Sequence, residues 1–134
     1  PTAQMPTVGS ATYTLLGATS PTYLDGSAAP GTLTGSLNVD FGRLTVGVNL
    51  NVAMPDGKGY GVGGTAQISS NFIFGSTGNG LTTSGTGGAC SSSGCGALVN
   101  GFFAGTTAER AGLGYHINDF ASSKEVIGAA AFKK

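Results

Sequence analysis

Residues 32–52 alternate between apolar and polar side chains in two consecutive runs. The run 33–41 carries Leu, Gly, Leu, Val and Phe at every second position, and the run 44–52 carries Leu and Val in the same way. A period of two with one apolar face is typical of a half-buried β-strand. Little more than Phe41-Gly42 separates the runs, so the sequence predicts a tight hairpin in which Gly42 supplies a positive φ.

The rest of the chain continues this pattern of short strands and turns. Pro55 and the pair Asp56-Gly57 predict a second turn, as Pro and Asp-Gly are favoured there. Further strands are expected at 11–16, 60–68, 72–74, 97–103, 113–117 and 126–132. About eight strands result, and closing the sheet removes its unpaired edges. We therefore predict an all-β fold, a closed eight-stranded antiparallel up-and-down barrel.

Two segments depart from the strand pattern. Residues 75–96 consist almost wholly of Gly, Ser, Thr and Asn, which predicts a long loop or a frayed hairpin. Residues 106–111 begin with Thr and contain good helix formers, which predicts one short helical turn that Gly112 ends.

Length and composition limit the classes of function that are expected for this chain. The 134 residues fit one barrel domain spanning 1–134, which we interpret as a mature chain or a domain cut from a longer envelope protein. Charged residues make up 9% of the chain and the formal net charge is zero, so neither nucleic acid nor an anionic membrane surface is an expected partner. No apolar stretch predicts a membrane-spanning helix. A neutral surface rich in hydroxyl groups suits an extracellular or outer-surface protein, with the periplasm as the alternative.

The two cysteines lie close together in a Gly/Ser-rich segment. Four residues separate Cys90 from Cys95, so a disulfide between them would close a small local loop. The alternative is a pair of free thiols in a reducing compartment. Two cysteines do not complete a tetrahedral zinc site, and His116 is the only histidine.

The C-terminal third resembles a known family. Its motif consists of a Gly-x-Phe-Phe strand, an Ala-Glu turn and a later Gly in the last strand. The matching residues are Gly101, Phe102, Phe103, Ala108, Glu109, Gly112 and Gly128. This motif resembles that of transferrin-binding-protein-B-like barrels of Gram-negative bacteria. The ending is also similar to barrel domains of FecR-domain-containing envelope proteins. The sequence departs from the motif at Gly105, one residue late, and at Leu113, which breaks a Gly pair. The resemblance implies a β-barrel fold. The members of this family include surface lipoproteins that bind host proteins.

The residues offer little for catalysis. A catalytic His116 would need a nucleophile and an orienting acid, and Asp119 is the nearest carboxylate in the sequence. Strand alternation places His116 on the face opposite Tyr115 and Ile117, which predicts an outward, structural histidine. We expect no enzyme activity, no metal site and no cofactor. In the turn before Arg110, the Glu109 carboxylate is expected to accept backbone N–H bonds.

The leading hypothesis is a binding module that recognises a protein or other macromolecule through its loops, about 18–32 and 75–97. The candidate recognition residues in or beside these loops are Tyr23, Asp25, Tyr60 and Leu81, with both tyrosines expected to be exposed. The alternative is a self-assembling subunit of a surface fibre, layer or matrix, in which residues 1–8 pair with the edge of a neighbour. A carrier of a small molecule inside the barrel is a third hypothesis.

Overall fold

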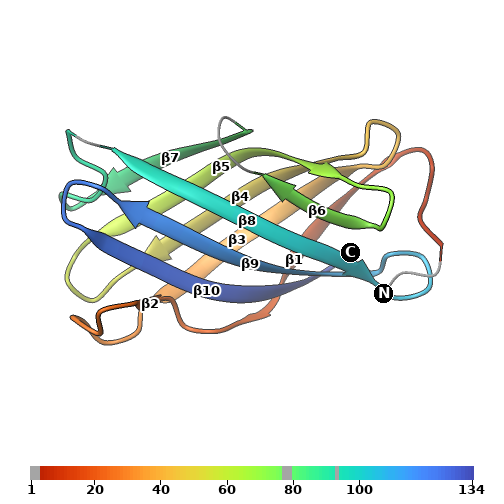
Figure 1. The fold of residues 1–134 in the computed structure, drawn as a ribbon. Helices are drawn as coiled ribbons and strands as arrows, with labels where there is room; N and C mark the ends of the chain where they lie inside the picture. The colour runs from red at the N-terminus through yellow and green to blue at the C-terminus, as the bar shows by residue number, and fades with distance from the viewer. Residues whose placement is uncertain (1–3, 77–79, 93) are drawn as a thin grey trace.

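The computed structural model describes residues 4–76, 80–92 and 94–134 of the chain. Its strands form one antiparallel sheet that closes on itself, because the first strand pairs with the last (Figure 1). The strands are β1 (Ser10–Ala18), β2 (Thr22–Tyr23), β3 (Thr32–Asp40), β4 (Thr45–Ala53), β5 (Gly59–Ile68), β6 (Ile73–Ser76), β7 (Leu81–Thr86), β8 (Cys95–Ala104), β9 (Arg110–Asp119) and β10 (Lys124–Lys133).

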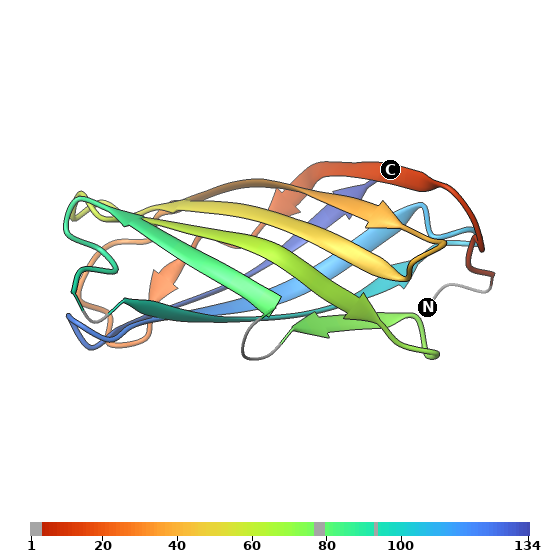
Figure 2. The same cartoon turned by 90° about the horizontal axis from the view of Figure 1, so that it is seen from above.

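Two positions in the barrel are each filled by two short strands. β6 and β7 lie one after the other along β5, where Phe74 pairs with Ile68 and Leu81 with Gly64. β1 and β2 follow each other along β10 in the same way. The segments therefore close an eight-stranded up-and-down barrel, which confirms the predicted fold (Figure 2).

The hairpin predicted from residues 32–52 is present. β3 and β4 pair without interruption from Thr32 opposite Ala53 to Asp40 opposite Thr45. The prediction that Gly42 supplies the positive φ is wrong, because Leu44 adopts it, with φ of 56°. The connection has four residues, 41–44, and hairpins of this length commonly place the left-handed residue last.

The predicted helical turn at 106–111 is also wrong. β8 ends at Ala104 and β9 begins at Arg110, so the segment between them is a tight turn and Gly112 lies within a strand. Ala108 has a φ of 61°, which is incompatible with a right-handed helix. The predicted role of Glu109 is confirmed, because its carboxylate accepts the backbone N–H of Thr107 at 3.1 Å.

The segment expected to be a long loop contains a strand. β7 pairs with the first half of β5, although residues 77–79 and 93 of the expected loop lie outside the described residues. Gly59 and Gly61 explain this pairing, because a Cβ at either position would collide with the hydroxyl group of Thr86 or Ser84. The glycines of β5 thus make room for the hydroxyl side chains of β7.

Alternate residues of each strand fill the inside of the barrel. Phe103 is 1% exposed and its ring packs against Tyr13, Phe41 and Phe74, whereas its neighbour Phe102 is 52% exposed. The two phenylalanines thus point to opposite sides of the sheet, as successive residues of a strand do.

At residues 4–5 the N-terminal segment, which was expected to pair with a neighbour, packs against its own barrel. The N–H of Gln4 donates to the carbonyl oxygen of Thr106 at 3.1 Å, and Met5 is buried in the core. Residues 1–3 of the expected arm lie outside the described residues. The arm therefore packs on its own barrel from Gln4 to Met5.

Candidate functional site: the loop end of the barrel

Four connections gather at one end of the barrel, which we call the loop end. They are residues 19–31, 54–58, 87–92 and 120–123. In an up-and-down barrel every second connection lies at the same end, so the topology brings these segments together. Gln4, the first described residue, and Lys134, the last, are hydrogen-bonded at the opposite end, to Thr106 and Glu109 of the turn between β8 and β9.

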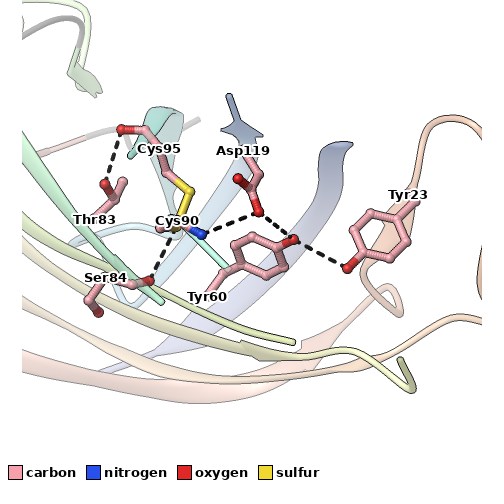
Figure 3. The surroundings of a disulfide bond; sticks show 7 residues. All are labelled: Tyr23, Tyr60, Thr83, Ser84, Cys90, Cys95 and Asp119. Carbon is pink, nitrogen blue, oxygen red and sulfur yellow. Dashed lines mark hydrogen bonds between the residues drawn. A yellow bond between two sulfur atoms is a disulfide. The ribbon is translucent and has the colours of Figure 1, made fainter. Parts of the chain in front are cut away.

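A buried polar network links three of these loops. Tyr60, in β5, donates a hydrogen bond to the carboxylate of Asp119 at 3.2 Å, and the two hydroxyl oxygens of Tyr60 and Tyr23 lie 3.2 Å apart (Figure 3). Tyr23 also donates to the carboxylate of Asp56 at 2.8 Å. The network connects the end of β9 with β2 and with the turn before β5, and thereby fixes their relative positions.

The network sets the ionisation of its members. Burial alone would raise the pKa of Asp119. The hydrogen bonds that its carboxylate accepts, above all from the Cys90 backbone N–H, outweigh burial and hold the pKa below the ordinary value. Burial, together with the neighbouring Tyr60 hydroxyl group and the hydrogen bond to Asp56, raises the pKa of Tyr23 far above that of a free tyrosine. Burial also raises the pKa of Tyr60, and hydrogen bonds from the Lys58 backbone and Tyr23 outweigh burial and lower the pKa of Asp56. At neutral pH both phenols are therefore protonated and both carboxylates are charged acceptors.

The disulfide lies beside this network. Cys90 and Cys95 are bonded, which confirms the pairing that the sequence favoured over free thiols. The backbone N–H of Cys90 donates to Asp119 at 3.3 Å, and the Thr83 hydroxyl donates to the carbonyl oxygen of Cys95 at 3.1 Å (Figure 3). Cys90 has a φ of 53°, a conformation that a non-glycine residue rarely adopts. The disulfide and the Asp119 contact together hold this residue in place.

Removing the disulfide is expected to destabilise the barrel measurably. The bond closes a loop with a sequence separation of five, for which the chain-entropy relation gives about 2 kcal/mol. The double variant Cys90→Ser/Cys95→Ser should lose about this much free energy of unfolding in a urea titration. Reduction should destabilise the wild type equally and leave the double variant unchanged. Equal stability of the oxidised wild type and the double variant would contradict this account.

The sequence-predicted recognition residues have different positions. Tyr23 and Tyr60 are 1% and 2% exposed, so the expectation that they are exposed is wrong, and both rings pack beneath the loops. Asp25 is exposed at the loop end, where its carboxylate pairs with Lys124 at 2.8 Å. Leu81 is half-buried at the start of β7, opposite Gly64 in the middle of β5, and does not lie at the loop end.

Two exposed apolar side chains at the loop end were missed in the sequence. Leu24 is 55% exposed directly after β2, and Phe120 is 53% exposed directly after β9. Phe120 covers Gly96 and borders a hollow of about 280 Å³ that also includes His116. Their positions in the sequence could have identified them, because each is a large apolar residue at the start of a polar turn.

The structure separates the residues considered for catalysis. His116 faces outward, as predicted, and its Nε2 lies 3.0 Å from a carboxylate oxygen of Glu125. Asp119 faces the interior and is fully buried. In the described ranges, no three His, Cys, Asp or Glu side chains cluster as metal ligands would. Nor does any described helix have the length and hydropathy needed to cross a membrane.

Solved structures share this architecture. A double variant of transferrin binding protein B from Haemophilus parasuis, a vaccine antigen, matches 96% of this chain with a TM-score of 0.50 and 16% sequence identity. A single variant of that protein covers the same share with a TM-score of 0.49 and 17% identity. The chain has a transferrin-binding-protein-B-like barrel fold. The sequence resemblance is thereby confirmed as a likeness of fold.

The likeness extends over only part of those proteins. The barrel spans 26% of the length of the double variant and 27% of the single variant. No protein-family model and no curated protein sequence matches the chain.

Proposed function

We propose that the chain is a non-enzymatic binding module, secreted or displayed on a cell surface, that recognises a protein partner through its loop end. The observation that carries this proposal is the exposure of Leu24 and Phe120 on loops that a buried network and a disulfide hold in place. Exposed aromatic side chains such as Phe120 are enriched at protein interfaces, and a rigid scaffold commonly carries them on its loops; Leu24 adds exposed apolar area. Asp25 and Lys124 add a charged pair beside them.

The absence of enzymatic activity is part of the proposal. An acyl-transfer site would need a base within hydrogen-bond reach of a nucleophile. The outward His116 instead lies against Glu125, and the buried Asp119 accepts hydrogen bonds from Tyr60 and Cys90. Each of these groups already has a structural partner, which favours binding over catalysis.

A location outside the cytosol is supported by two features. Disulfides persist in oxidising compartments, and Cys90 and Cys95 are bonded. The fold is shared with a protein whose name states that it binds transferrin, itself a protein ligand. We propose for this chain the same class of ligand, a protein, without transferrin as its specific partner.

Site-specific photo-crosslinking tests the proposal. A photoreactive amino acid is placed at Leu24 or Phe120, and the matched controls carry it at Val8 or Leu44, which are 77% and 46% exposed toward the opposite end. The chain is expressed in its source organism and irradiated on intact cells. We expect a discrete product with another protein from positions 24 and 120 alone. Products from positions 8 and 44 alone, or no product from any position, would overturn the proposal.

A further inference from the structure

The outer surface of β8, β9 and β10 is apolar at its centre. Leu98, Phe102 and Ile127 point outward and are 41%, 52% and 38% exposed. The strand register places these side chains in two rows, one on each side of the row of Asn100, Gly114 and Ala129. Phe102 lies beside Gly112 in one of these rows, and Leu98 and Ile127 lie beside His116 in the other. We call the outward side of these three strands the apolar face.

A shallow groove of about 550 Å³ crosses this face. Its floor consists of Gly112, Gly114, Ala129 and Ala131, and the ring of Phe102 lies across Gly112. A Cβ at position 112 would come within 2.8 Å of that ring, so glycine is needed for this packing. The groove is therefore a built feature of the sheet, and it leaves the middle of the face lower than its ends.

Charges of opposite sign lie at the two ends of the apolar face. Lys133 and Arg110 are cross-strand partners at one end, and Glu125 lies opposite Asn118 at the other. Along β10, Lys133 and Glu125 are each four residues from Ala129, which lies in the groove. The face is thus positive at one end and negative at the other, with its midpoint in the groove.

We infer that the partner of this face is a second copy of the chain. A two-fold axis that runs across the strands, along the row of Asn100, Gly114 and Ala129, reverses the strand direction of the second copy. This symmetry places Lys133 of each copy opposite Glu125 of the other. The alternative axis, parallel to the strands, would bring like charges together. Charge complementarity therefore selects one arrangement of the dimer.

Side-chain size is complementary under the same axis. The row that contains His116 and Ile127 faces the row that contains Gly112 and Ala131 in the other copy. Ile127 thereby meets Ala131, a small side chain of the groove, on each side of the axis. Phe102 faces Leu98 of the other copy, which removes two exposed apolar side chains from water.

The dimensions of the face predict a weak dimer. The groove extends from the apolar face onto β1, where Gly17 and Ala18 line it, so β1 is included in the contact. Strands β8, β9, β10 and β1 together are about 19 Å wide at about 4.8 Å per strand, and the eight steps from Glu125 to Lys133 span about 26 Å. The dimer would bury about 1,000 Å² in total, at the lower limit for a specific interface. We therefore expect dissociation in the micromolar range. The two-fold axis closes the assembly, so it yields a dimer and not a fibre.

Charge reversal tests the arrangement. Sedimentation velocity of the 134-residue chain, over a concentration series, gives the dissociation constant. Glu125→Lys or Lys133→Glu should each raise the dissociation constant at least tenfold, because each change creates a like-charge pair at both of the 125–133 contacts in the dimer. The double variant Glu125→Lys/Lys133→Glu should restore it to within about threefold. Arg43→Glu, on the turn between β3 and β4, changes the net charge as Lys133→Glu does and should have no effect.

A steric variant makes the test independent of charge pairing. Ala129→Arg adds a bulky side chain at an exposed position in the groove and should abolish the dimer, whereas Thr34→Arg, exposed on β3, should not. A wild-type chain that stays monomeric at millimolar concentration, or a dimer that survives Ala129→Arg, would overturn the inference. The crosslinking test places its probes at Leu24 and Phe120, which the dimer test does not change. The proposed loop-end function and the proposed dimer can therefore fail independently of each other.

Discussion

Replacing Phe103 with alanine should destabilise the barrel by about 3–5 kcal/mol, as expected for a buried phenylalanine whose removal leaves a cavity. The ring is 1% exposed, and its centroid lies 5.2 Å from that of Phe74, 5.9 Å from Tyr13 and 6.4 Å from Phe41. These contacts join four segments of the barrel. For a chain of this length the loss corresponds to a fall in Tm of about 10–20 °C.

Phe102 provides the matched control on the same strand. Its ring is half-exposed and packs on Gly112, so Phe102→Ala should cost about 1 kcal/mol or less. Urea unfolding in dilute solution, where the chain is monomeric, measures both variants. Comparable losses for the two variants would contradict the assignment of Phe103 to the inside and Phe102 to the outside.

The second large effect is a loss of stability at alkaline pH. All four tyrosines are buried: Tyr13, Tyr23, Tyr60 and Tyr115. Burial, aided by the charge of Glu109, raises the pKa of Tyr13 to about 12, and burial alone raises that of Tyr115 to about 12. Burial also raises the pKa of Tyr23 and Tyr60. The folded barrel therefore keeps protons that the unfolded chain releases above about pH 10.

The sign of the effect follows from this difference. Below about pH 10 the phenols are protonated in both states, so their contribution to stability is fully present. Between about pH 10 and pH 12 the free energy of unfolding should fall by up to about 1.4 kcal/mol per pH unit for each tyrosine. For Tyr13, Tyr23 and Tyr115 this approaches about 4 kcal/mol per pH unit, to which Tyr60 adds in the same direction, and the sum is enough to unfold a domain of ordinary stability.

Tyrosinate absorbance and circular dichroism, recorded together during an alkaline titration, measure this effect. The chain has no tryptophan, so the absorbance reports tyrosine alone. Both signals should change in one cooperative step. The control is Tyr115→Phe, since the Tyr115 hydroxyl has no hydrogen-bond partner among the described residues. This variant should keep its stability at neutral pH and show a slope reduced by about a quarter. Tyrosinate forming near pH 10 in a still-folded barrel would contradict the account.

The sequence predicts the barrel well where side chains alternate. Residues 32–52 gave the correct hairpin, because inward Leu and Val and outward Thr and Asn bury one face of each strand. Parity also placed His116 on the outside correctly. Local conformation was less predictable, since Leu44 takes the positive φ expected of Gly42 and Ala108 interrupts the expected helical turn.

Long-range pairing explains most of what was missed. β7 has a loop-like composition, and its strand conformation depends on the glycines of β5, which leave space for Thr86 and Ser84. Tyr23 looked like an exposed loop residue because its burial depends on pairing with Val126, far away in the sequence. Such contacts between distant segments leave no periodic signal in the segment itself.

The inward orientation of Asp119, a residue of the candidate site, could have been predicted from the sequence. Asp119 follows Tyr115 and Ile117 at intervals of two, so strand parity predicts that it faces inward with them. An inward carboxylate at the end of a strand implies hydrogen-bond donors around it. The donors, Tyr60 and the backbone of Cys90, are identified only by the closed barrel.

The central claim is that the loop end recognises a protein partner. The most direct measurement is the yield of crosslinked partner from a photoreactive residue at Phe120 relative to the yield from Leu44, on intact cells of the source organism. Both side chains are about half-exposed, at 53% and 46%, so accessibility alone predicts equal yields. The account predicts a discrete partner from position 120 in large excess over position 44. Equal yields, or an excess from position 44, would contradict it.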